Sequence, residues 1–93
     1  MFVPSMFILM RHEENEVDSC MHMAGTFDSH DEAAKYMLAS YERVKTDYET
    51  ANPFDEWQLA YADDDQAELK VEGMPDRWVW AIFDTAHRMS VWF

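Results

Sequence analysis

Residues 29–48 read SHDEAAKYMLASYERVKTDY, and this stretch decides the fold because it carries the clearest helix signal in the chain. Ser29 and Glu32 fit the S-x-x-E capping box, in which the two side chains satisfy backbone N–H groups at the start of a helix. Asp31 and Glu32 also suit the positive end of the helix dipole. The chain therefore has a well-defined helix start at this point.

Behind this cap, apolar residues recur at spacings of three and four, which is the pattern of an amphipathic helix. The predicted buried stripe consists of Ala34, Met37, Leu38, Tyr41, Val44 and Tyr48. We predict a helix over residues 30–48, ended by residues 50–53 because Pro53 disfavours helical geometry at Asn52.

On both sides of the helix, the apolar residues alternate with a period of two, which predicts strands. Trp57, Leu59 and Tyr61 should share one face of their strand, while the apolar residues of 78–83 occupy both faces, as in a central strand. The predicted strands cover residues 6–12, 19–27, 57–62, 67–72 and 78–83, with a short last strand at 89–93.

The predicted fold is therefore α+β, with the order β-β-α-β-β-β and one amphipathic helix packed on a mostly antiparallel sheet. A chain of 93 residues fits a single domain covering residues 1–93. One helix covers only one face of a sheet, so we expect the other face to be solvated or buried against another surface.

Acidic residues dominate the composition: 19 Asp and Glu stand against 7 Lys and Arg, for a formal net charge of −12. This exceeds the magnitude of about 2–8 that keeps a small domain soluble. The chain is also 48% hydrophobic and 15% aromatic, so it is not a disordered acidic tail. Such a surface should be repelled by anionic lipids and by nucleic-acid phosphates, which excludes membranes and nucleic acids as direct partners.

The single cysteine, Cys20, excludes an intrachain disulfide, so we expect a cytoplasmic protein. The apolar residues 1–10 have no basic residue before them and are too short to span a bilayer, which takes about 20 residues. We interpret them as the start of a buried first strand rather than as a signal peptide.

Metal chemistry is not expected. Cys20 and His22 lie on one face of a predicted strand with His12 within reach across a hairpin, but a structural zinc site needs four ligands. Residues 63–65 are acidic, but Glu68 stands where a calcium-binding EF-hand loop needs glycine. The interpretation is a packed cysteine, surface histidines and a solvated turn, with no cofactor.

Catalysis is not expected either. Ser90, His87 and Asp84 could supply a nucleophile and a base, but no nucleophile elbow surrounds the serine. Only two glycines are present, too few for a phosphate-binding loop. We therefore predict a binding protein that is not an enzyme.

The acidic residues fall in four groups, at 13–18, 28–32, 47–56 and 63–72. Carboxylates two residues apart on a strand are about 6.6–6.8 Å apart, close to successive phosphates of an extended nucleic acid. We predict that two of these groups bind a partner, with exposed tryptophans as anchors. The predicted site residues are Glu13, Glu14, Glu16, Asp18, Asp63, Asp64, Asp65, Glu68, Glu72, Trp57 and Trp80.

Residues 7–38 resemble the front half of small phage and bacterial domains of unknown function. The matching pattern is a strand ending in His-Glu, an acidic loop, a strand ending in Gly-x-Phe-x-Ser, and a helix that begins with Glu-Ala. The matching residues are His12, Glu13, Gly25, Phe27, Ser29, Glu32 and Ala33. This resemblance implies the β-β-α order and no active site.

In size and charge, the chain is also similar to phage-encoded inhibitors of host defence, including anti-CRISPR proteins and DNA mimics. This resemblance implies a non-enzymatic inhibitor that binds a basic nucleic-acid-handling protein of the host, such as a CRISPR effector or nuclease. Two alternatives stay open: a small phage or bacterial accessory domain that forms a homodimer, and an immunity protein that neutralises a basic toxin.

Overall fold

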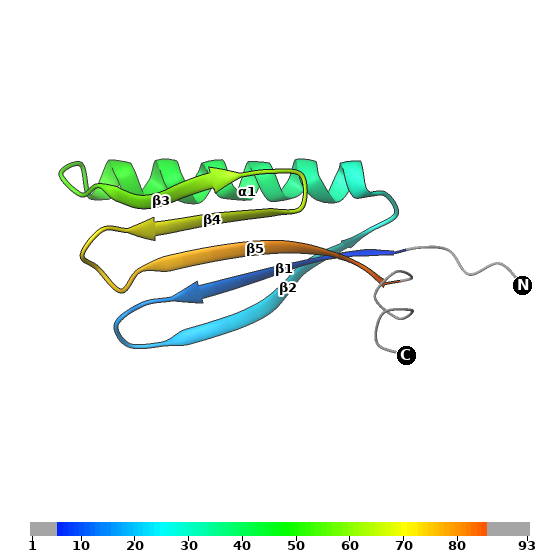
Figure 1. Cartoon of the computed structure of the whole chain (residues 1–93), viewed down its shortest axis with the longest axis horizontal. Coiled ribbons are helices and arrows are strands. Elements are labelled where there is room, and N and C mark those ends of the chain that lie inside the picture. Colours follow the sequence, from blue (N-terminus) through cyan, green and yellow to red (C-terminus); the bar gives the residue numbers. More distant parts are fainter. Residues whose placement is uncertain (1–5, 86–93) are drawn as a thin grey trace, which may run out of the picture.

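A five-stranded antiparallel sheet carries one long helix on one of its faces, in a computed structural model that describes residues 6–85 (Figure 1). The predicted α+β architecture is confirmed. The predicted strand at 89–93 lies outside the described residues, as do His87 and Ser90. The elements follow one another as β1 (Phe7–Glu14), β2 (Ser19–Phe27), α1 (His30–Ala51), β3 (Trp57–Ala62), β4 (Gln66–Val71) and β5 (Arg77–Asp84).

The strand order in the sheet is β2-β1-β5-β4-β3, which places β5 at the centre. β1 pairs with β5 along its whole length, from Phe7 opposite Asp84 to Glu14 opposite Arg77. This pairing joins the two sheet hairpins, β1–β2 and β3–β4, through the last strand. Trp78, Trp80 and Ile82 of β5 belong to the core beneath α1, whereas Val79, Ala81 and Phe83 lie on the sheet face that α1 does not cover.

Helix α1 begins where the capping box predicts. The hydroxyl of Ser29 accepts a hydrogen bond from the backbone N–H of Glu32 at 3.2 Å. The helix ends at Ala51 rather than at the predicted residue 48, because Pro53 acts only on Asn52. The backbone N–H of Asn52 donates to the carbonyl of Tyr48 at 2.8 Å and closes the last turn.

The helix is rotated relative to the predicted stripe. Ala33, Met37 and Tyr41 are its buried residues, whereas Leu38 is 48% exposed. The prediction for Leu38 was therefore wrong. Small Ala33 is fully buried against the sheet, and this close approach fixes which face of α1 turns inward.

The core lies between α1 and the centre of the sheet. Its largest fully buried side chains are Trp80, Leu9, Met37, Leu69 and Val71. Burying side chains of this size stabilises a fold by roughly 1.5–3 kcal/mol each. The rings of Tyr41 and Trp80 meet edge to face, with their centroids 5.9 Å apart, and join α1 to β5.

An irregularity in β3 separates two residues that were predicted to share a face. The register with β4 shifts between Trp57 and Leu59. Trp57 consequently packs on the helix side, with its ring centroid 5.2 Å from that of Tyr48, while Leu59 is 40% exposed on the opposite face. A bulge of this kind reverses the alternation of side chains.

Candidate functional site: the acidic surface

The acidic residues gather at the two ends of the long helix (Figure 1). The β1–β2 loop, the end of α1 and the β4–β5 turn lie at one end, here called the hairpin end. The start of α1 and the β3–β4 turn lie at the other, here called the cap end. With 22 residues, α1 is about 33 Å long, so these ends are well separated. The predicted group at 63–72 is therefore divided, with residues 63–65 at the cap end and Glu72 at the hairpin end near the group at 13–18.

The carboxylates of the cap end differ from those of the hairpin end in having no ion pair to a Lys or Arg within residues 6–85. His30 Nε2 lies 2.8 Å from Asp65 Oδ1 and ties the β3–β4 turn to the start of the helix. Within residues 6–85, the ion pairs of Lys and Arg are Arg11–Glu13, Lys45–Glu49 and Arg77–Glu68, and none of them is at this end. The cap end consists of the exposed residues Asp28, Asp31, Glu32, Asp63, Asp64 and Asp65.

Asp63 and Asp64 have different roles within this end. Oδ1 of Asp63 accepts hydrogen bonds from the backbone N–H groups of Asp65 and Gln66, each at 2.8 Å, and these bonds hold the pKa of Asp63 below its usual value. Asp63 therefore shapes the turn. Asp64 has no hydrogen-bond partner in the described part of the chain, so its carboxylate is open to a partner.

The hairpin end is built around a tight loop. Oδ1 of Asn15 accepts from the backbone N–H groups of Val17 and Asp18, each at 2.9 Å, which leaves Glu16 exposed at the tip. Asp18 accepts from the backbone N–H of Ser19 at 2.8 Å. The exposed carboxylates at this end are those of Glu16, Asp18, Asp47, Glu49, Asp55, Glu56 and Glu72, with the half-buried Glu14 beside them.

Some of the acidity at the hairpin end is used internally. Oε2 of Glu49 accepts from the indole of Trp57 and from Lys45, each at 2.9 Å, and these two hydrogen bonds lower the pKa of Glu49. The hydroxyl of Tyr48 donates to Asp55 at 2.7 Å. These carboxylates stabilise the join between the end of α1 and β3.

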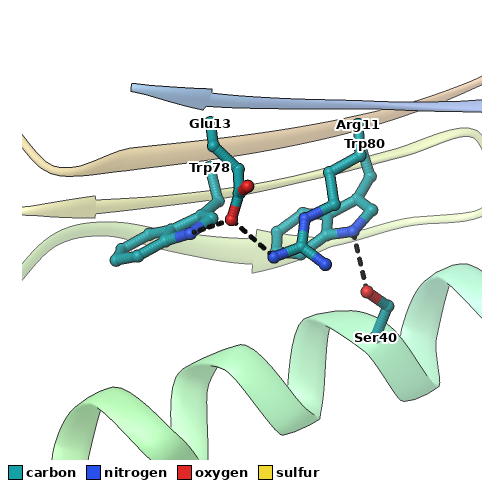
Figure 2. Close-up of polar contacts among 5 residues, drawn as sticks. All are labelled: Arg11, Glu13, Ser40, Trp78 and Trp80. Carbon is teal, nitrogen blue, oxygen red and sulfur yellow. Dashed lines mark hydrogen bonds and ion pairs between the residues drawn. The ribbon is translucent and has the colours of Figure 1, made fainter. Parts of the chain in front are cut away.

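Two predicted acidic site residues serve the fold. Glu13 accepts from Arg11 at 2.6 Å and from the indole of Trp78 at 3.2 Å, on the helix side of the sheet (Figure 2). The side chain of Glu68 is 13% exposed and is paired with Arg77 at 2.7 Å. Each of these carboxylates is therefore paired with an arginine of the same chain.

The predicted aromatic anchors need a correction. Trp80 is fully buried in the core, so the prediction that it is exposed was wrong. Trp57 is half-buried, and its indole N–H is already bonded to Glu49. Both rings lie on the helix side of the sheet, which the sequence pattern could not distinguish from the other side.

The sequence prediction gave no binding role to Asp28, Asp31 and Glu32. The structure places them beside residues 63–65 at the cap end, through the contact between His30 and Asp65. The signal that could have found them is the capping box itself, since it fixes where an acidic first turn begins.

The suspected metal ligands are separated. Cys20 pairs with Glu13 and His22 with Arg11, on the helix side, whereas His12 pairs with Met21 on the other face. No group of His, Cys, Asp and Glu within residues 6–85 could hold a metal ion.

No helix in this part of the chain has the length and apolar character to cross a membrane. Comparison of the chain with protein-family models, curated proteins and solved structures gave no match.

Proposed function

We propose that this chain is a non-enzymatic acidic inhibitor, encoded by a phage, that acts in the cytoplasm of the host bacterium. Its partner would be a basic nucleic-acid-handling protein such as a CRISPR effector. Binding would block the nucleic-acid groove of the partner or the rearrangement that the partner needs for activity. The observation that carries this proposal is the cap end, where exposed carboxylates from two elements lie together and none is paired with a Lys or Arg of residues 6–85.

Physical chemistry supports this use of the cap end. Unpaired like charges repel one another and weaken the compact state, so they are more readily understood if a partner neutralises them. A basic groove would attract such a surface from a distance, which speeds association and makes it sensitive to salt. The residues of the acidic turn at 63–65 are all exposed, so a partner can reach them.

The direct test measures DNA binding by purified Cas9-type effectors loaded with guide RNA, with and without the protein. We expect inhibition at about 150 mM salt and much weaker inhibition near 500 mM, where charges on exposed surfaces are largely screened. A pull-down from bacterial lysate at the same two salt concentrations would extend the search to other nucleases, with DNA added as a competitor.

Matched variants then locate the surface. Replacing Asp28, Asp31 and Asp64 by Asn removes three exposed carboxylates from the cap end, and replacing Glu16, Glu56 and Glu72 by Gln removes three from the hairpin end. Each set changes the formal net charge from −12 to −9. We expect the cap-end set to weaken inhibition and the hairpin-end set to leave most of it. If both triple variants inhibit as strongly as the wild type does, the proposal is contradicted.

A second candidate function, a homodimeric accessory domain, is favoured by the sheet face that α1 does not cover. Met21 and Met23 there are 64% and 58% exposed. Beside them is a shallow apolar hollow of about 70 Å³, lined by Met10, His12, Met21, Val79, Ala81 and Phe83. Exposed apolar patches of this kind often mark protein-binding sites.

The two functions differ in oligomeric state. The dimer predicts twice the monomer mass of 11.0 kDa in light scattering, and a return to monomer when Met21 and Met23 are replaced by Ser. The inhibitor predicts that the same double variant keeps its inhibition, because it leaves the cap end unchanged.

A further inference from the structure

A basic cleft opens between α1 and the β1–β2 side of the sheet. Its volume is about 330 Å³, and it is lined by Arg11, Tyr36, Ala39, Ser40 and Arg43. Ligand pockets range from about 300 to 1,000 Å³, so this cleft has room for a small molecule. Among residues 6–85, its lining contains two arginines and no acidic residue, in a chain where Asp and Glu outnumber Lys and Arg by 19 to 7.

Arg11 forms the floor of this cleft and is held in place. Its guanidinium carbon lies 5.7 Å from the centroid of the Trp80 ring, and its Nη2 donates to Glu13 (Figure 2). The Nε of Arg11 is buried without a hydrogen-bond partner in the described residues. A guanidinium has five N–H donors, and Glu13 occupies only one side of the group.

Ser40 lies on the side of the cleft formed by α1, and its hydroxyl proton is not donated to any acceptor within residues 6–85. Its oxygen accepts from the indole N–H of Trp80 at 3.0 Å (Figure 2). The hydroxyl of Thr50, on the same helix, donates to the carbonyl of Thr46 at 2.8 Å, but that of Ser40 has no acceptor among residues 6–85. The Ser40 hydroxyl can therefore donate into the cleft.

Arg43 supplies a second, uncommitted cation. It lies one turn of α1 beyond Ser40, is exposed, and has no hydrogen bond or ion pair within residues 6–85. Glu13 offsets the charge of Arg11, so Arg43 leaves the cleft with a net positive charge. The ring of Tyr36, packed against Phe27 at a centroid distance of 5.4 Å, adds an aromatic wall.

We propose that this cleft binds a small organic anion, whose carboxylate or phosphate group contacts Arg43, Arg11 and the Ser40 hydroxyl and whose apolar part lies against Tyr36. Arginine presents a planar fork of donors that matches the oxygens of both headgroups. The apolar wall selects against a bare inorganic ion. This site is independent of the acidic ends and of their proposed partner.

The test titrates the full chain with phenyl phosphate and, separately, with benzoate, and follows two-dimensional ¹H–¹⁵N NMR spectra. The indole N–H of Trp80 is the reporter because it is bonded to Ser40 and lies beneath Arg11. We expect a saturable shift of this signal with at least one anion and none with neutral benzyl alcohol. The anion that binds more tightly identifies the headgroup.

Two variants with the same change in charge complete the test. Arg43→Gln removes the uncommitted cation, and Lys35→Gln removes another exposed cation of α1 that does not line the cleft. We expect Arg43→Gln to weaken binding about tenfold or more, as for the loss of a charge-assisted hydrogen bond. Lys35→Gln should leave it unchanged. Equal weakening in both variants, or no saturable shift in the wild type, would overturn the proposal.

Discussion

The hydrogen bond between Trp80 and Ser40 joins the helix to the centre of the sheet, and its contribution can be worked out. The Trp80 side chain is fully buried, and its indole N–H lies 3.0 Å from the Ser40 oxygen. Ser40→Ala leaves a buried donor without an acceptor, which costs about 1–3 kcal/mol. Alanine regains up to about 0.5 kcal/mol through its helix propensity. Water from the adjoining cleft can reach the donor, so we expect a net loss of about 1 kcal/mol.

A double-mutant cycle separates this hydrogen bond from other effects of the substitution. Trp80→Phe keeps an aromatic ring but has no N–H, so in that background Ser40→Ala should lose no hydrogen bond and should gain up to about 0.5 kcal/mol from helix propensity. The free energy of unfolding is measured by urea titration, followed by far-UV circular dichroism because Trp80→Phe alters the fluorescence. We expect a coupling energy of about 1.5 kcal/mol, because the helix-propensity gain is common to both backgrounds and cancels. A value below about 0.3 kcal/mol, the usual error of additivity, would refute the role given to this bond.

Three further predictions concern pH and the backbone. The pKa of Asp63 is lowered in the folded state, so its stabilising effect is present above the ordinary value of 3.8 and is lost as the pH falls below it. The melting temperature of Asp63→Asn should therefore be lower than that of the wild type at pH 7 and equal to it near pH 2. Burial and the hydrogen bond to Asp55 raise the pKa of Tyr48 to about 12, so stability should fall as the pH rises from 10 towards 12, and less so in Tyr48→Phe. Gly73 has a φ of 74° with open space around it, so Gly73→Ala should cost about 1–2 kcal/mol in urea titration through the backbone alone.

Local signals made most of the secondary structure predictable. The capping box located the start of α1, and the alternation in residues 19–27 located β2 with the bounds that the structure shows. Both signals depend only on neighbouring residues. The strand order was not predictable, because the pairing of β1 with β5 depends on contacts between the two ends of the chain.

The candidate sites were less predictable for the same reason. The burial of Trp80 depends on which face of β5 the helix covers. Both faces carry large apolar residues, so the sequence did not show which of them packs against the helix. The basic cleft brings together Arg11 and Arg43, which lie far apart in the sequence and only meet once α1 packs on the sheet. The acidic groups were visible in the sequence, but their division between two ends follows from the direction of each strand.

Strand β2 bears on how this protein resists edge-to-edge association between copies. It is the outermost strand of the sheet, and its sequence SCMHMAGTF contains no Asp, Glu, Lys, Arg or Pro. Unpaired backbone groups on such an edge can template the addition of strands from other molecules, and many proteins place lysine or proline there to prevent it. In this chain we expect the protection to come from the mutual repulsion of molecules that each carry a formal net charge of −12. Near the isoelectric point of about 4.4 that repulsion disappears, so colloidal stability and edge protection are lost together.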